Sequence, residues 1–190
     1  IIKEHADYVR RVLDHYGYTN AEHHLNEWNL YTYKQHRDDS MAAAKSLAFM
    51  LMMQNSSTDV MCFYDGGVGF SPYRCLINPD NGTPYRNYYS FMMFNTLYTL
   101  KNQVECVTEE KGVYASAAKC GKKAAIVLSN PTATPVTLDL DISGFDATDV
   151  QFLRIDEENR YTMTGETISN NQVNLPAFGA LEIKLFDLSE

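Results

Sequence analysis

Long apolar runs, clusters of basic residues and cysteine motifs are all missing from this sequence of 190 residues. No window reaches the roughly 18 consecutive apolar residues that a membrane-spanning helix needs. The nearest stretch, residues 41–53, is interrupted by Lys45 and Ser46. The formal net charge is −8, whereas binding to a phosphate backbone depends on clustered Lys and Arg. We therefore expect no nucleic acid and no membrane as partners, and a neutral or small polar ligand instead.

The cysteines fit neither a zinc motif nor a disulfide framework. Their spacing matches no set of zinc ligands, and a chain of this size does not need disulfide staples. The four are Cys62, Cys75, Cys106 and Cys120. We expect reduced thiols, which favours a reducing compartment such as the cytoplasm. The sequence predicts no metal and no other cofactor.

A leader segment is missing as well. The chain begins at Ile1 without Met and without a basic-then-apolar leader, and its first residues already show helical periodicity. We expect the sequence to be truncated at this end. The missing signal peptide therefore does not decide the compartment.

The sequence has ample material for packed cores, because 45% of its residues are hydrophobic and 12% are aromatic. In the first hundred residues, helical periodicity alternates with short strand-like runs. The pattern predicts helices over 2–16, 41–54 and 86–100, with strands over 22–29 and 60–64. The second strand is a continuous apolar run, which is typical of a parallel strand covered on both faces.

Beyond about residue 104 the hydrophobic period changes to two, which is the pattern of half-buried antiparallel strands. Turn residues separate about seven such runs. The predicted strands cover 113–118, 123–129, 136–142, 150–155, 160–164, 172–175 and 181–186. We expect an antiparallel β-sandwich over residues 104–190.

The segment 21–29 carries the strongest indication of chemistry, because it places Glu27 and Trp28 at the end of a short strand. Glycoside hydrolysis needs a carboxylate held against the anomeric carbon. Sugar rings bury their C–H faces on aromatic side chains. Glu27 is therefore the candidate catalytic residue, and Trp28 is a candidate substrate platform. Packing at the rim of the fold is the alternative for Trp28.

Four more residues are candidates for substrate binding. His23 and Asn29 share a face with Glu27 if the strand keeps its period of two. Tyr64 and Asp65 stand where the second predicted strand ends. A buried, hydrogen-bonded ring is the alternative for His23, and capping of the following turn is the alternative for Asp65.

Several motifs together indicate a family. They are Leu25-Asn26-Glu27-Trp28-Asn29, Phe63-Tyr64-Asp65-Gly66-Gly67, Pro84-Tyr85-Arg86-Asn87-Tyr88-Tyr89 and Phe94-Asn95-Thr96-Leu97-Tyr98. Essentially the whole chain resembles the C-terminal part of retaining (β/α)8-barrel glycoside hydrolases. The nearest resemblance is to family 39, the β-xylosidase and α-L-iduronidase-like enzymes, and to its bacterial relatives.

The resemblance implies an α/β portion followed by an all-β portion. Residues 1–103 would hold strands seven and eight of a TIM barrel with their flanking helices, and residues 104–190 the β-sandwich. In such enzymes the seventh strand ends in the nucleophilic Glu, which Glu27 matches. The fourth strand carries the acid/base Glu after an Asn, and Asn26-Glu27 mimics that pair. A fourth-strand placement would need four more βα units, about 120 residues at ~30 each, which the chain lacks before the sandwich.

The resemblance implies a retaining enzyme acting on xyloside- or arabinoside-like glycans. Its acid/base would be missing from this chain, so we expect the chain alone to be inactive. The alternative is a non-catalytic carbohydrate-binding or structural bracing module. Residues 104–190 contain no Trp and only scattered aromatic residues, which favours bracing. An incomplete barrel would also expose a sheet edge, so association into a homo-oligomer is expected.

Overall fold

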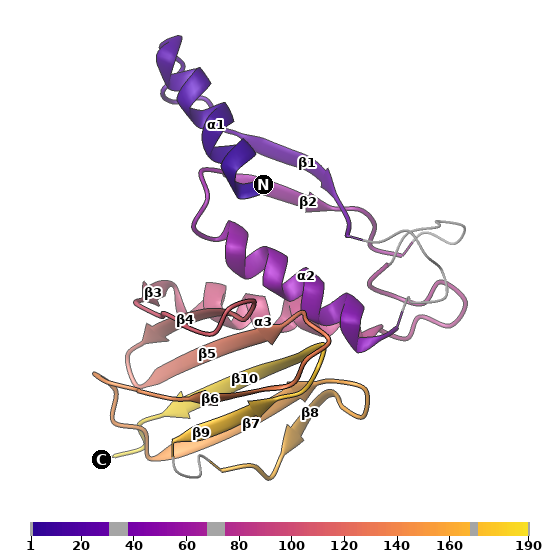
Figure 1. Ribbon diagram of the computed structural model, residues 1–190, viewed down its shortest axis with the longest axis vertical. Coiled ribbons are helices and arrows are strands. Elements are labelled where there is room, and N and C mark those ends of the chain that lie inside the picture. The colour runs from indigo at the N-terminus through magenta and orange to yellow at the C-terminus, as the bar shows by residue number, and fades with distance from the viewer. Residues whose placement is uncertain (1, 31–37, 68–74, 168–170, 190) are drawn as a thin grey trace.

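The computed structural model describes residues 2–30, 38–67, 75–167 and 171–189, and this part of the chain contains three helices and ten strands (Figure 1). The first half comprises α1 (Ile2–His15), β1 (His24–Trp28), α2 (Ser40–Met53), β2 (Val60–Phe63) and α3 (Arg86–Leu100). These elements confirm the predicted helices and strands to within two residues at each end. β1 and β2 pair in parallel, so this half is an α/β arrangement.

The second half consists of antiparallel strands. They are β3 (Asn102–Val104), β4 (Tyr114–Cys120), β5 (Lys123–Asn130), β6 (Val136–Asp139), β7 (Asp149–Ile155), β8 (Arg160–Thr164), β9 (Gln172–Leu175) and β10 (Gly179–Phe186). Six of them form one sheet in the order β3-β4-β5-β10-β7-β8, and β6 pairs with β9. All seven predicted strands are present, and β3 is an addition.

An apolar layer joins the six-stranded sheet to the β6-β9 pair. Alternate residues of the central strands, such as Phe152, Leu181 and Ile183, point into it and are buried. Val173 and Leu175 of β9 close the layer from the other side. Two antiparallel sheets packed through such a layer form a sandwich, as the period of two predicts.

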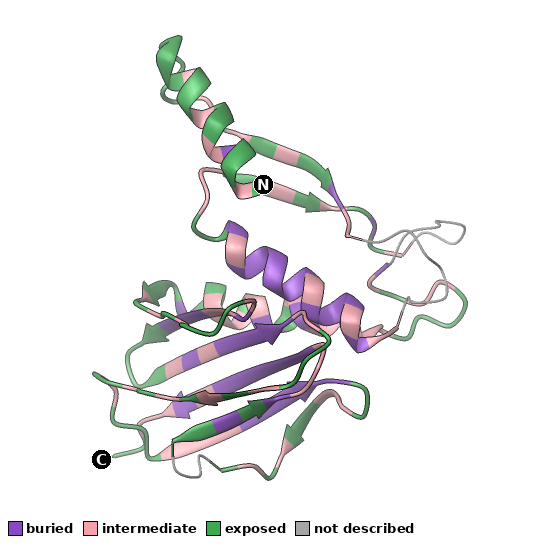
Figure 2. Ribbon diagram, viewed as in Figure 1, coloured by how far each residue is buried: buried purple, intermediate pink, exposed green. Residues whose placement is uncertain are grey.

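The opposite face of the six-stranded sheet is covered by α2 and α3 (Figures 1 and 2). Asp39 caps α2 by accepting a hydrogen bond from the Ala42 N–H at 2.8 Å. α2 is apolar on nearly every side, and Figure 2 shows it buried along most of its length. Leu47 of α2 and Met93 of α3 share one core with Val127 of β5. The domain boundary at residue 104 stays a prediction, because this core extends across it.

Charged side chains reinforce the same junction. Arg86, at the start of α3, donates to the Asp38 carbonyl at 2.8 Å, the Asp156 carbonyl at 2.9 Å and the Glu157 carbonyl at 2.8 Å. Arg160 of β8 forms an ion pair with Asp38. The loop before α2 and the turn between β7 and β8 are thereby tied to the start of α3.

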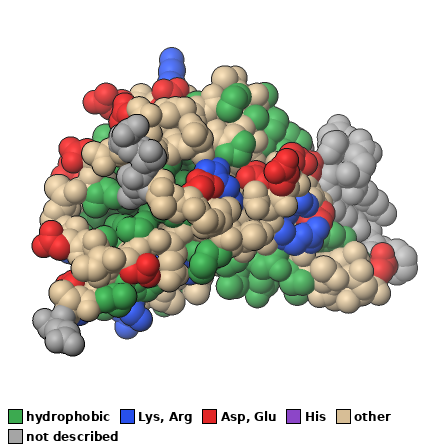
Figure 3. Space-filling model, turned by 90° about the horizontal axis from the view of Figure 1, so that it is seen from below, with side chains coloured by type: hydrophobic (Ala, Val, Ile, Leu, Met, Phe, Trp, Pro, Cys, Tyr) green, Lys and Arg blue, Asp and Glu red, His purple; other side chains and the backbone are tan. Residues whose placement is uncertain are grey.

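None of the described helices combines the length and the apolar character needed to cross a bilayer. No group of three or more His, Cys, Asp or Glu side chains in the described ranges could hold a metal ion. All four cysteines lie in described segments, and each is a thiol rather than half of a disulfide. On the face seen in Figure 3, acidic and basic side chains are interspersed among apolar ones.

Candidate functional site

The candidate site lies at the carboxyl edge of the parallel pair. Trp28 pairs with Phe63, and the Tyr64 N–H donates to the Trp28 carbonyl at 2.9 Å. The parallel pairing therefore brings Glu27 to the same edge as Tyr64 and Asp65. In α/β folds the loops at this edge of a parallel sheet build the ligand site.

A β-bulge sets the direction of the Glu27 side chain. Between Leu25 and Trp28 the register with β2 shifts, so β1 contains an extra residue there. Leu25 and Trp28 both pack into the core on the helix side, while Asn26 and Glu27 are exposed. β1 therefore does not keep the period of two on which the predicted common face of His23, Glu27 and Asn29 depends. Bulges of this kind re-aim side chains next to active sites.

The Glu27 carboxylate is accessible. Glu27 is exposed, and it makes no hydrogen bond or ion pair to the rest of the described chain. Tyr64, which directly follows β2, is 43% exposed. An accessible carboxylate at the edge of a parallel pair has the chemistry to attack an anomeric carbon.

Trp28 lies in the core rather than on the surface. It is 7% exposed. Its ring centroid is 4.7 Å from that of Phe49, 4.9 Å from that of Phe63 and 6.0 Å from that of Phe91. This placement favours the packing alternative over a sugar platform. The indole anchors the end of β1, and thereby the backbone of Glu27, against α2 and α3.

Asn29 and Asp65 fix the two strand ends to each other and to the next turn. The Asn29 side-chain amide donates to the Tyr64 carbonyl at 2.5 Å. Asp65 is 5% exposed, and its Oδ1 accepts from the Gly67 N–H at 3.1 Å. The turn-capping alternative for Asp65 therefore has direct support. Both side chains are placed to position Tyr64 and the backbone that follows it.

His23 stands apart from these residues. It precedes β1, where its backbone N–H donates to Asp59 Oδ2 at 2.7 Å and its carbonyl accepts from the Asp59 N–H at 2.9 Å. Four residues of extended chain, about 13 Å at ~3.3 Å per residue, separate it from Glu27. The structure does not bring His23 to the candidate site.

Among the carboxyl groups with shifted pKa values, Glu166 and Glu182 lie away from the strand edge. Hydrogen bonds from Arg154 lower the pKa of Glu166, in an open groove of about 500 Å³ beside β9. Burial raises the pKa of Glu182, which is fully enclosed between β10 and α3. Both Glu166 oxygens are occupied by the guanidinium, and no substrate can reach Glu182. Neither carboxyl is placed for catalysis, and Glu27 remains the accessible one at the strand edge.

Comparison with known proteins gives matches by fold and not by sequence. No protein-family model matches the chain, and no curated protein matches it. A glucosidase from Croceicoccus marinus is similar with a TM-score of 0.75 at 16% identity, over 99% of this chain and 51% of that one. A family 39 β-xylosidase from Caulobacter crescentus gives 0.68 at 15% identity, over 98% and 49%.

A glycoside hydrolase family 30 subfamily 8 xylanase from Clostridium acetobutylicum gives a TM-score of 0.69 at 15% identity, over 90% of this chain and 44% of that one. The chain thus spans about half the length of these solved structures or less. At such identities the likeness shows the fold. The predicted resemblance to glycoside hydrolases, family 39 among them, is confirmed at that level.

Proposed function

We propose that this chain is the C-terminal part of a retaining glycoside hydrolase, with Glu27 as its nucleophile. In this assignment β1 and β2 are strands seven and eight of a (β/α)8 barrel, and the sheets that follow form the terminal β-sandwich. The observation that carries the proposal is the accessible Glu27 carboxylate, aimed outward by the bulge at the carboxyl edge of β1. The fold shared with glycoside hydrolases over nearly the whole chain supports it.

The retaining mechanism requires two carboxyl groups ~5–5.5 Å apart. Glu27 would attack the anomeric carbon and form a glycosyl–enzyme ester, while an acid would protonate the leaving oxygen and later deprotonate the incoming water. Asp65 does not fit the acid role, because it is buried and caps the turn at Gly67. We assign the acid/base to a barrel strand outside this chain, so the chain alone hydrolyses glycosides poorly or not at all.

The proposed substrate class is a neutral xyloside- or arabinoside-like glycan. Two of the similar structures are named as a xylanase and a β-xylosidase. The exposed Tyr64 ring is placed to contact one sugar face, while Asn29 holds its carbonyl. Trp28 contributes by fixing the strand end and not by contacting sugar.

The test is Glu27→Gln in the longer protein that carries this chain, with aryl β-xylosides and α-arabinosides as substrates. The substitution keeps the shape and removes the attacking charge, so kcat should fall by several orders of magnitude while folding is retained. In Glu27→Ala, where removal of the side chain leaves room for a small anion, azide should restore turnover and give a glycosyl azide of inverted configuration. Near-normal kcat in Glu27→Gln would refute the assignment and reopen the fourth-strand alternative.

For the sandwich itself, bracing is the role that the structure favours among the non-catalytic alternatives. Val127, Ile155 and Ala180 of the six-stranded sheet share one buried core with Leu47 and Met93 of the helices. A sheet packed in this way holds α2 and α3 in place, and thereby the strands that precede them.

A further inference from the structure

We propose a second carbohydrate-binding site in the hollow between the C-terminal ends of α2 and α3 and the strands β3 and β4. Its ligand would be a neutral segment of a polysaccharide. The inference rests on the proposed function for the substrate class, but it concerns residues far from Glu27.

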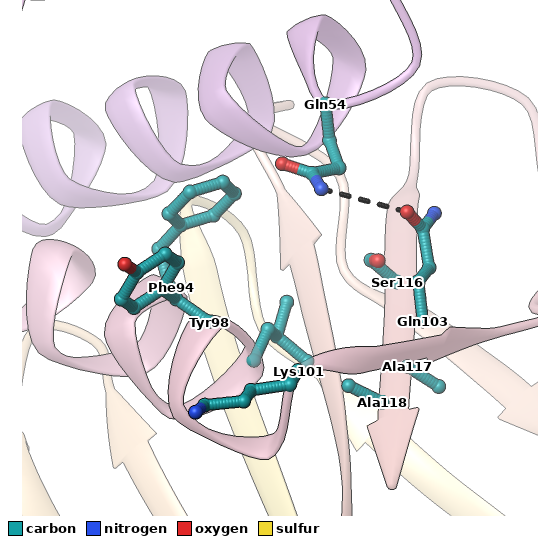
Figure 4. A pocket seen from close by; sticks show the side chains of 9 residues that line it. Gln54, Phe94, Tyr98, Lys101, Gln103, Ser116, Ala117 and Ala118 are labelled. Carbon is teal, nitrogen blue, oxygen red and sulfur yellow. Dashed lines mark hydrogen bonds between the residues drawn. The ribbon is translucent and has the colours of Figure 1, made fainter.

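The hollow has a volume of about 290 Å³ and combines apolar walls with a polar rim. Figure 4 shows Phe94 and Tyr98 of α3 on one side, with Gln54 and Gln103 across from them. Its lining is completed by Leu97, Lys101, Ser116, Ala117 and Ala118. Apolar walls with a few convergent polar groups are the usual composition of a site for a small organic ligand.

The rim has unused hydrogen-bonding capacity. Gln54 Nε2 donates to Gln103 Oε1 at 3.5 Å, well beyond the usual 2.9–3.0 Å. Gln103 Nε2 donates to Asn55 Oδ1 at 3.1 Å. Ser116 is 4% exposed, and its hydroxyl has no hydrogen-bond partner in the part of the chain that the structure describes. A ligand rich in hydroxyl groups would satisfy the Ser116 hydroxyl and both amides.

Tyr98 supplies a flat surface at the mouth of the hollow. It is 76% exposed, as high as any large apolar side chain in the described ranges. Phe94 lies one helical turn earlier on the same side of α3 and lines the hollow. A pyranose ring stacked on Tyr98 would bury its C–H face and leave its hydroxyls directed at Gln54 and Gln103.

The local electrostatics favour a neutral ligand over an anion. Both α2 and α3 end here, with Gln54 and Lys101 as their C-terminal caps. Each helix end carries about half a negative charge on its last carbonyl groups. The Lys101 ammonium offsets the half charges of the two helix ends together, about one negative charge, and the chain as a whole carries −8. Carbonyl acceptors of this kind suit sugar hydroxyl donors and disfavour phosphate or carboxylate.

The hollow is remote from the strand edge that holds Glu27. α2 begins after the carboxyl edge and, through its 14 residues, returns the chain to the start of β2 (Figure 1). That length is about 21 Å at ~1.5 Å per residue. A polysaccharide held here would stay close to the enzyme after each cleavage. The second contact would raise the effective concentration of further chain segments.

The experiment uses this chain as it stands, with xylohexaose titrated calorimetrically and by shifts in two-dimensional NMR spectra. Tyr98→Ala should weaken binding at least tenfold, and Gln103→Ala at least threefold. The matched control is Tyr16→Ala, which removes another aromatic ring that is 71% exposed and should leave binding unchanged. Circular dichroism verifies folding of each variant.

Three outcomes would overturn the proposal. The first is no binding of xylohexaose by the folded chain, and the second is binding that Tyr98→Ala and Gln103→Ala leave unchanged. The third is equal or tighter binding of the anionic oligomer of galacturonic acid. Glu27→Gln should bind xylohexaose at this site like the unaltered chain. The activity test of Glu27 therefore does not bear on the second site. A negative result in the xylohexaose experiment does not bear on the assignment of Glu27 as nucleophile.

Discussion

At the scale of single residues, two neighbouring aromatic side chains have opposite tasks. Trp28 is 7% exposed and packs against three phenylalanine rings, whereas Tyr64 is 43% exposed at the end of the adjacent strand. Because Trp28 is buried, it stabilises the strand end. Because Tyr64 is accessible, it can contact substrate. The two are joined by the hydrogen bond from the Tyr64 N–H to the Trp28 carbonyl.

Substitution of each ring by Ala should separate these tasks. Trp28→Ala leaves a cavity in the core and should lower the free energy of unfolding by about 3–5 kcal/mol. Tyr64→Ala removes a half-exposed ring and should lower it by about 0.5 kcal/mol or less. Urea denaturation followed by circular dichroism measures both. Similar losses for the two variants would contradict the division of roles.

The accessible Glu27 could be predicted from sequence because a strand-length run ends there before a loop. Its direction could not, because a period of two cannot reveal the extra residue between Leu25 and Trp28. The same bulge turns Trp28 inward, although a lone Trp beside a candidate nucleophile suggests a sugar platform. A period of two also predicts a common face for His23 and Glu27, but the bulge interrupts that period and His23 precedes β1.

At the scale of elements, the contact between α3 and the six-stranded sheet contains a buried carboxyl group. Glu182 of β10 is fully buried, accepts a hydrogen bond from the Tyr161 hydroxyl at 2.7 Å and lies 3.7 Å from the Lys184 ammonium. The side chain of Thr96 on α3 also favours the charged form of this carboxyl. Because burial outweighs these partners, the pKa of Glu182 is raised above its ordinary value.

Stability should therefore depend on pH through this group. A carboxyl whose pKa is higher in the folded state than in the unfolded state binds more protons when folded. Its contribution is present below the unfolded pKa, about 4.3, and is lost as pH rises through the folded pKa. Glu182→Gln keeps an acceptor for Tyr161 but carries no charge at any pH, so it avoids the loss of stability that deprotonation of Glu182 causes. It should therefore stabilise the fold at pH 8 by on the order of 1 kcal/mol.

Urea denaturation across pH 4–8 measures the effect, with the exposed Glu109→Gln as control. Equal pH slopes for Glu182→Gln and the unaltered chain would contradict the role of the buried carboxyl.

The elements around Glu182 were predictable, since periods of 3.6 and of two are clear in α3 and β10. β3 was not, because three residues are too few to show a period. Nor could the sequence show that Glu182 faces a helix instead of water.

At the scale of the whole molecule, α1 and the β1-β2 pair carry apolar surface that no described element covers. Ile2, Tyr8, Val9 and Val12 of α1 are 36–59% exposed, although their spacing forms one stripe of an amphipathic helix. Among the described residues the parallel sheet has two strands, so both present an edge that no described strand pairs with. Two-stranded sheets are marginal by themselves, and open edges favour pairing with another chain.

The chain should therefore associate with a second copy through this region. Light scattering after size exclusion at micromolar concentration should give a mass of at least twice the 21.6 kDa of one chain. Val9→Lys combined with Val12→Glu places charge on the stripe without touching the sheet core, and it should shift the equilibrium towards monomer. The matched control is the exposed pair Lys119→Glu and Lys122→Glu at the opposite sheet, which should leave the mass unchanged. A clean monomer of the unaltered chain would mean that α1 and β2 shield their apolar groups without a partner, and the expected association would be wrong.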